Sequence, residues 1–153
     1  MTEILFYHLE KRCLEEVLPE LVERALARKW RALIRTESAD RAEAIDRLLW
    51  TYSDDSFLPH AQTGDGDAGS QPVLITLEPG NPNGADVLFL VGGAMPEIGN
   101  EDMVSLARMV VLFDGRDATA ISGARAAWIR AKECGHETTY WKQSARGKWE
   151  KQT

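Results

Sequence analysis

The stretch Met109-Val-Val-Leu-Phe113 decides the fold class, because an unbroken apolar run of this length is typical of a strand buried on both faces. Two similar runs precede it in the chain, Pro72–Leu77 and Ala85–Val91. Such strands occur in parallel sheets that helices cover on both sides. The three runs therefore predict the central strands of a mostly parallel α/β sheet.

Helical periodicity alternates with apolar strands in the first third of the chain. Ile4–Leu9 is a short apolar strand, and Trp30–Ile34 is predicted as a second one. Ser38 is a suitable N-cap for the helix that follows. Three- and four-residue steps between apolar residues predict one helix from Leu14, Val17, Leu18, Leu21, Val22, Ala25 and Leu26, and another from Ala42, Ile45, Leu48 and Leu49.

The last third predicts a helix and a hairpin. Helical spacing returns at Ala118–Glu133, and Thr138–Gln143 with Lys148–Lys151 forms a candidate hairpin. Strands that alternate with helices indicate right-handed crossovers and helices on both faces of the sheet. We therefore expect one α/β domain over residues 1–153, with a long, exposed, mobile loop at about 53–71 and a basic tail at about 136–153.

Charge is distributed unevenly along the chain. Residues 123–153 hold seven cationic and three acidic side chains, a net charge of +4, whereas the whole chain carries -6. A basic end on an acidic protein attracts an acidic partner to one face. The net acidity argues against a general duplex-DNA-binding protein. No membrane-length apolar stretch and no secretion signal occur in the sequence, so a cytoplasmic protein is expected.

Standard catalytic and cofactor motifs are missing from the sequence. Neither GxGxxG nor GxxxxGK[ST] occurs, and the glycines near residue 66 lie beside Asp65 and Asp67, which repel phosphate. The three histidines are far apart in sequence, and Cys13 and Cys134 have no zinc-ligand spacing, so they are expected to be reduced thiols. We predict no metal and no cofactor. A binding module is the leading class.

Several aromatic motifs carry a family resemblance. Phe6-Tyr7, Ser56-Phe-Leu-Pro-His60, Ala124-Arg-Ala-Ala-Trp128, Gly135-His-Glu137 and Tyr140-Trp-Lys142 occur in this order along the chain. Together they resemble the chi subunit of the bacterial DNA polymerase III holoenzyme. The resemblance implies a Rossmann-like three-layer sandwich without nucleotide binding. It also implies a monomeric, non-catalytic accessory protein of the clamp loader, which acts in replication or in repair of stalled forks.

In that family, one surface binds the acidic C-terminal tail of single-stranded-DNA-binding protein. Ile121, Arg125, Trp128 and Lys132 follow helical spacing and share one apolar and cationic face. The family often has a lysine directly after the aromatic residue, where this chain has Ile129, so part of the cationic rim comes from Arg130 or is missing. The alternative is that Trp128 packs into the core and the cations are only solvated.

The resemblance also implies a second surface, which binds the psi subunit or a repair helicase of the XPD-like class. Pro59 restricts Leu58 to extended geometry. A surface segment of this kind displays Phe57 beside Trp50, with His60 following, as aromatic anchors for a partner. The alternative is that Trp50 ends a core helix and Phe57 packs under the long loop.

Two other function classes remain open. One is a divergent nucleotide-dependent or helicase-like enzyme, because many enzymes share a parallel α/β sheet. The other is a direct single-stranded nucleic-acid contact made by the basic tail, since stacking on single strands requires aromatic and cationic side chains. The tail interleaves Tyr140, Trp141 and Trp149 with Lys142, Arg146 and Lys148.

Overall fold

A computed structural model of the chain describes residues 3–10, 14–51, 61–62, 72–77, 84–91, 106–143 and 149–152, without the side chains of residues 50, 51, 61, 62 and 152. Its elements in chain order are β1 (Glu3–Leu9), α1 (Leu14–Ala27), β2 (Ala32–Arg35), α2 (Ala39–Thr51), β3 (Ala61–Gln62), β4 (Val73–Thr76), β5 (Val87–Leu90), β6 (Arg108–Asp114), α3 (Ala118–Glu133), β7 (Thr138–Gln143) and β8 (Trp149–Gln152).

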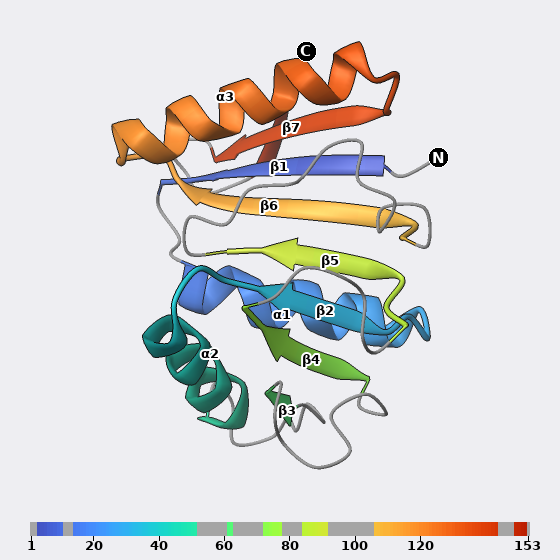
Figure 1. Cartoon of the computed structure of the whole chain (residues 1–153), viewed down its shortest axis with the longest axis vertical. Coiled ribbons are helices and arrows are strands. Elements are labelled where there is room, and N and C mark those ends of the chain that lie inside the picture. Colours follow the sequence, from blue (N-terminus) through green and yellow to red (C-terminus); the bar gives the residue numbers. More distant parts are fainter. Residues whose placement is uncertain are drawn as a thin grey trace.

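The eight described strands form one sheet, in the order β3-β4-β2-β5-β6-β1-β7-β8 (Figure 1). Every pair in this order is parallel except β7 and β8, which form the antiparallel hairpin predicted at the end of the chain. β6, the strand of the Met109–Phe113 run, lies between β5 and β1 near the middle of the sheet. The predicted mostly parallel α/β fold is confirmed.

Helices pack on both faces of the sheet, as the unbroken apolar runs predict. The side chains of β1, β2, β4, β5 and β6 alternate between two separate hydrophobic clusters. One cluster joins the sheet to α1 and α2, through residues such as Leu5, Val110, Val22 and Ile45. The other joins the opposite face to α3, through Phe6, Met109, Ala124 and Ala131. The fold is a three-layer sandwich.

Two local features differ from the sequence prediction. The second strand begins at Ala32 instead of Trp30, because α1 ends in a turn in which Lys29 has a φ of 63°. The Lys29 and Trp30 amides donate to the carbonyls of Leu26 and Ala25, a Schellman ending that occupies the residues before the strand. Within the predicted irregular stretch 53–71, residues 61–62 form the short strand β3 beside β4.

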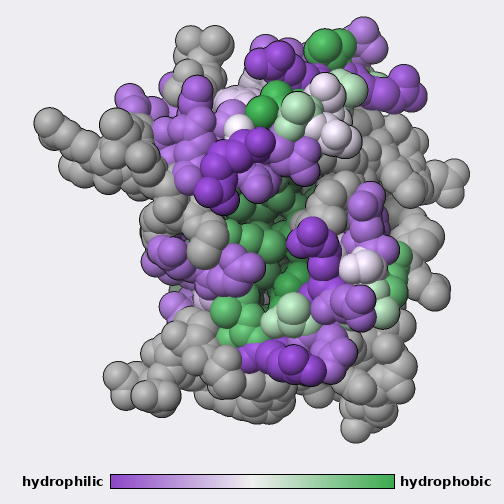
Figure 2. Space-filling view, turned by 90° about the vertical axis from the view of Figure 1, so that its left-hand side faces the viewer, coloured by the Kyte–Doolittle hydropathy of each residue, from purple (hydrophilic) through white to green (hydrophobic). Residues whose placement is uncertain are grey.

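The carboxyl ends of the parallel strands lie at one edge of the sheet. β1 and β6 are neighbours there, but α1 follows β1 on one face and α3 follows β6 on the other. Neighbouring strands whose helices leave to opposite faces define the position where open α/β sheets generally bind ligands. Viewed from this edge, hydrophobic residues show in a hollow between hydrophilic ones (Figure 2).

Candidate functional site on helix α3

Both ends of α3 are fixed by the local sequence. Asp117 is the N-cap, and its carboxylate accepts the amides of Thr119 at 2.9 Å and Ala120 at 3.4 Å. At the other end, the amides of Gly135 and His136 donate to the carbonyls of Lys132 and Ala131. This Schellman pattern requires a left-handed residue, and Gly135 supplies it with a φ of 81°.

Alanines form the buried side of α3. Ala124, Ala127 and Ala131 are buried against β6, β1 and β7, and they recur at three- and four-residue steps. Short side chains bring the helix close to the sheet. As a result Ile121 and Trp128, at the margins of this stripe, are partly buried and partly accessible.

Trp128 links the core to the surface. Its ring makes edge-to-face contacts with Phe6, at a centroid distance of 5.6 Å, and with Tyr140, at 5.8 Å. The Lys132 ammonium lies 4.5 Å from the centre of the same ring. The sequence is compatible with a Trp128 that packs into the core and with one that faces a ligand. In the structure the ring packs against the core cluster but remains partly exposed.

The exposed side of α3 is cationic and partly apolar. Arg125, Arg130 and Lys132 are exposed, and none of them has a carboxylate partner among the residues that the structure describes. Ile129 between them is 56% exposed. On α3, apolar side chains therefore lie beside cations that have no carboxylate partner among the described residues. We call this surface the α3 strip, and it consists of the six predicted residues Ile121, Arg125, Trp128, Ile129, Arg130 and Lys132.

A polar cluster at the carboxyl end of β1 lies beside this strip. His8 Nδ1 lies 2.8 Å from the Tyr140 hydroxyl, and His8 Nε2 lies 3.0 Å from Glu10. A neutral imidazole with its proton on Nε2, the side of the Glu10 carboxylate, accepts the Tyr140 hydroxyl at Nδ1. Lys142 Nζ lies 3.8 Å from the same Glu10 carboxylate.

Sequence reasoning did not assign the His8 cluster to the site. His8 and Tyr140 are separated by 132 positions, and parallel pairing of β1 with β7 brings them together. Tyr140 also contacts the ring of Trp128, so the His8 cluster packs against the α3 strip through Tyr140. The Tyr140-Trp-Lys142 motif is the available sequence signal, but nothing in it indicates His8 as a partner.

Burial lowers the pKa of His8 below its usual value near 6.5, an effect that outweighs the opposing pull of Glu10 and is assisted by Lys142 and Arg125. Burial also raises the pKa of Tyr140. At neutral pH the pair is therefore an uncharged imidazole and an uncharged phenol. Their hydrogen bond joins β1 to β7 beneath α3.

The lowered pKa of His8 predicts a pH-dependent stability. The unfolded chain binds the proton more readily, so the contribution of His8 is complete above about pH 6.5 and is lost as the pH falls toward the folded pKa. Each unit by which the pKa is lowered corresponds to about 1.4 kcal/mol. In urea unfolding between pH 7.5 and pH 5.5, His8→Gln should flatten the decline in stability, whereas the control His136→Gln should retain it. An unchanged slope in His8→Gln would contradict the assignment.

The predicted second surface lies largely outside the described residues. Trp50 belongs to the last turn of α2, but its side chain is not described, and Phe57, Leu58, Pro59 and His60 are not described at all. Cys13 is also outside the described residues, whereas Cys134 is an exposed free thiol at the end of α3. Within the described ranges, no group of three or more His, Cys, Asp or Glu side chains is placed to hold a metal ion.

A solved structure shares the fold of this chain, and a protein family matches most of its sequence. The C-terminal domain of the DEAD-box protein Dbp5 superimposes with a TM-score of 0.57, covering 92% of this chain and 90% of that one, at 13% sequence identity. This likeness shows the fold alone. The family described as DNA polymerase III chi subunit, HolC, matches residues 1–139. The chain belongs to this chi family.

A curated relative supports the assignment. The probable DNA polymerase III subunit chi of Rickettsia prowazekii (strain Madrid E) is 31% identical over 91 residues, which cover 60% of this chain and 55% of the relative. The match therefore spans little more than half of that protein. The family and this relative are both named for DNA polymerase III.

The region of this chi-family chain that the family matches ends within β7. It contains all of α3 and the first residues of β7, and it ends before Tyr140, Trp141 and β8. The cationic strip thus lies within the matched region, whereas the end of the hairpin lies beyond it. No helix in the described parts of this chi-family chain is long and apolar enough to cross a membrane.

Proposed function

We propose that this chain is a non-catalytic accessory subunit of the DNA polymerase III clamp loader, which binds the acidic C-terminal tail of single-stranded-DNA-binding protein. It acts as an adaptor in the cytoplasm and is a monomer on its own. Membership of the chi family supports the association with the polymerase. The residues of the α3 strip support the contact with the tail.

One observation carries the proposal: three exposed cations on α3 have no carboxylate partner among the described residues, and they surround accessible apolar side chains. In an acidic chain, uncompensated charge of this kind favours an anionic partner. An apolar surface next to it favours a partner that also carries an aromatic or aliphatic group. A short acidic peptide with an aromatic end has both properties.

The residues have distinct roles in this proposal. Arg125 binds the terminal carboxylate through a charge-assisted contact. Trp128 and Ile121 form the wall against which the terminal aromatic side chain packs. Arg130 and Lys132 supply positive charge for the preceding aspartates, and Lys132 is held over the Trp128 ring by their cation–π contact.

A second surface, formed by Trp50 and Phe57–His60, binds the psi subunit or an XPD-like helicase in this proposal. Its support is the family membership and the position of Trp50 at the end of α2. α2 packs on the sheet face opposite α3, so the two partners do not compete for the same helix.

The tail contact predicts a defined loss on substitution. The probe is a fluorescent peptide that matches the last ten or so residues of the host single-stranded-DNA-binding protein. Arg125→Ala should lower the affinity for this peptide by about 10-fold to 100-fold, because hydrogen bonds to charged groups contribute about 1.5–3 kcal/mol. Fluorescence anisotropy measures the change. Added salt should weaken the wild-type contact as well.

Two controls make this result specific. Arg47→Ala removes an equal charge from α2, where Arg47 pairs with Glu43 at 2.7 Å, and should leave peptide affinity unchanged. A peptide that lacks the terminal aromatic residue should bind weakly to the wild-type protein. Equal losses in the two arginine variants, or no binding by the wild type at high concentration, would overturn the tail-binding proposal.

A further inference from the structure

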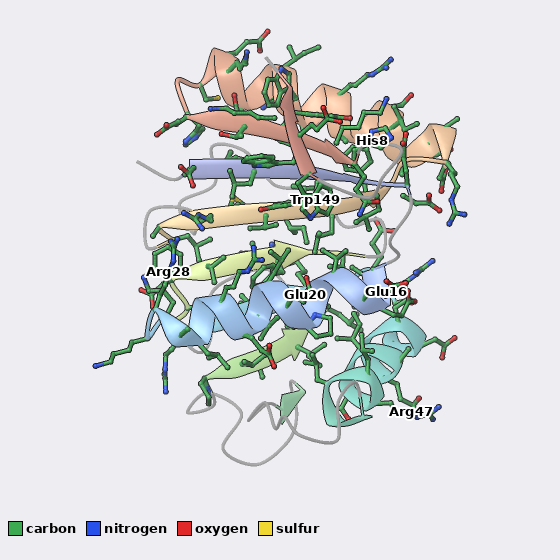
Figure 3. All side chains as sticks on the ribbon, turned by 180° about the vertical axis from the view of Figure 1, so that it is seen from behind. His8, Glu16, Glu20, Arg28, Arg47 and Trp149 are labelled. Atoms are coloured by element: carbon green, nitrogen blue, oxygen red, sulfur yellow. The ribbon has the colours of Figure 1, made fainter. Side chains whose placement is uncertain are left out.

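A groove lies on the sheet face opposite α3. α1 contacts β2 and β6 on this face, and it leaves the neighbouring part of β1 and β7 uncovered by a helix in the described structure. In Figure 3, which views this face, α1 runs across the sheet and Trp149 lies between it and β1. The groove encloses about 390 Å³. Its buried floor consists of Leu5, Val87, Phe89 and Val110.

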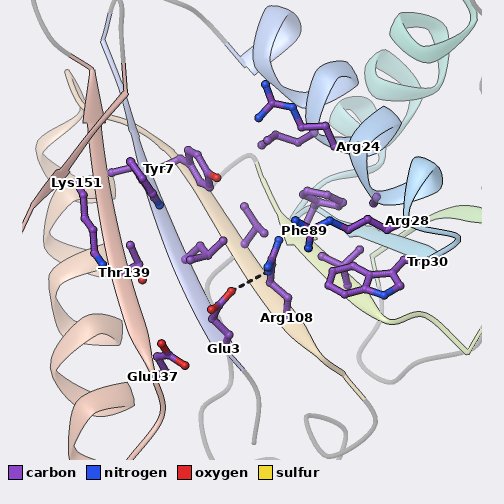
Figure 4. A pocket seen from close by; sticks show the side chains of 16 residues that line it. Glu3, Tyr7, Arg24, Arg28, Trp30, Phe89, Arg108, Glu137, Thr139 and Lys151 are labelled. Carbon is purple, nitrogen blue, oxygen red and sulfur yellow. Dashed lines mark hydrogen bonds and ion pairs between the residues drawn. The ribbon is translucent and has the colours of Figure 1, made fainter.

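Both walls of the groove carry cations. Arg24 in the last turn of α1 and Arg28 in the turn that follows it line one wall, and Lys151 of β8 lines the other (Figure 4). All three are exposed, and none has a carboxylate partner among the described residues. Arg108 differs, because it pairs with Glu3 at 2.8 Å. Glu137 also lines the groove, so three cations face it beside one carboxylate outside the Arg108–Glu3 pair.

Aromatic side chains lie between these cations. The Schellman ending of α1 places Trp30 against two guanidinium groups, those of Arg28 at 5.3 Å and Arg108 at 5.2 Å from the ring centre. Trp141 of β7 lines the opposite wall, is partly exposed, and has no ring partner among the described residues. One aromatic face thus remains available to a ligand.

The hairpin separates the aromatic residues of the tail. Tyr140 packs toward α3, whereas Trp149 packs on the α1 face, edge-on to Tyr7 at 4.9 Å. The aromatic residues that the sequence interleaves with tail cations therefore do not share one face of the sheet. Trp141 joins α1 cations that are far away in sequence, and this combination is visible only in the folded chain.

We propose that this groove binds single-stranded nucleic acid, with a base against Trp141 and backbone phosphates at Arg24, Arg28 and Lys151. Aromatic platforms flanked by cations are how proteins bind single strands without sequence preference. Cations on two walls above an apolar floor suit a ligand with charges along a backbone and flat apolar groups between them. The groove is independent of the α3 strip, so it extends the proposed function.

The test measures how tightly the full chain binds a labelled oligothymidylate of about 15 nucleotides. Fluorescence anisotropy reports the binding across a range of salt concentrations. We expect saturable binding that salt weakens and that quenches tryptophan fluorescence. Arg24→Gln combined with Arg28→Gln should weaken binding at least tenfold. It should also lower the dependence of log affinity on log salt by about 1.4, because each single-strand phosphate contact contributes about 0.7.

The matched control is Arg41→Gln combined with Arg47→Gln, which removes the same charge from exposed positions on α2. It should retain the affinity and salt dependence of the wild type, and Arg125→Ala should retain them as well. Circular dichroism and thermal unfolding confirm that each variant is folded. Trp141→Leu should abolish the fluorescence change.

Three outcomes would overturn the proposal. The first is the absence of oligonucleotide binding at low salt, and the second is an equal loss in the two double variants. The third is that Arg24→Gln combined with Arg28→Gln loses affinity for the acidic peptide but keeps its affinity for the oligonucleotide. That result would make the groove a peptide-binding site. Because Arg125→Ala reports on α3 separately, failure of either proposal leaves the other testable.

Discussion

Phe6→Ala should lower the free energy of unfolding by about 3–5 kcal/mol, the usual cost of truncating a buried phenylalanine. Phe6 has 0% of its surface exposed, in the cluster between the sheet and α3. Its ring contacts Trp128 at 5.6 Å and Tyr140 at 6.4 Å, so truncation removes a partner from both. Urea unfolding at pH 7.5 measures the loss.

The control Leu77→Ala truncates a large apolar side chain that is 44% exposed. Its effect should stay within about 0.5 kcal/mol, as for most surface substitutions. The milder Phe6→Leu should remain folded and still weaken the α3 peptide contact, since Trp128 loses part of its support. A loss in Phe6→Ala no larger than that in Leu77→Ala would contradict the packing described for this cluster.

Gly115→Ala should lower the free energy of unfolding by about 3 kcal/mol or more, at the upper end of the cost of overpacking. Gly115 lies in the turn between β6 and α3, and its amide donates to the Leu9 carbonyl at 2.8 Å. An added Cβ would overlap the His8 imidazole and approach the Leu9 carbonyl oxygen to 2.8 Å. The imidazole has little room to move, because it is 7% exposed and packs against Phe113 and Tyr140.

A double-mutant cycle separates overlap from other effects. In a His8→Ala background, Gly115→Ala should cost clearly less, because the overlapping ring is gone and only the Leu9 contact remains. Gly135→Ala serves as the comparison. Its Cβ meets no atom within 4 Å, but its φ is 81°, so it should cost about 1–2 kcal/mol through backbone strain alone. Additive losses for His8 and Gly115 would contradict the overlap.

The prediction of elements from sequence succeeded where the signal is local. Unbroken apolar runs gave β4, β5 and β6, and helical steps predicted α1 and α3 with ends close to those observed. The Ser38 cap is also a local signal, and its hydroxyl accepts the Arg41 amide at 3.2 Å. Trp30 was assigned wrongly because the competing signal, a left-handed Lys29, is rare for a lysine and has no sequence signature.

The α3 strip was also predictable, because helical periodicity alone places Ile121, Arg125, Trp128 and Lys132 on one face. The degree of burial was not. Whether Trp128 is a core residue or a surface residue depends on how close α3 approaches the sheet, and Ala124, Ala127 and Ala131 set that distance.

By itself, the sequence determined the α/β class, the position of most elements and the concentration of positive charge near the C-terminal end, because these properties depend on residues that are neighbours in the chain. The tertiary structure decided which distant side chains meet. Parallel pairing of β1 with β6 and β7 joins His8 to Tyr140 and to the Gly115 turn. The position of α1 beside the β7–β8 hairpin places Arg24 and Arg28 opposite Trp141 and Lys151. Strand order depends on which crossing connections bury the most apolar surface together, and no single segment contains that information.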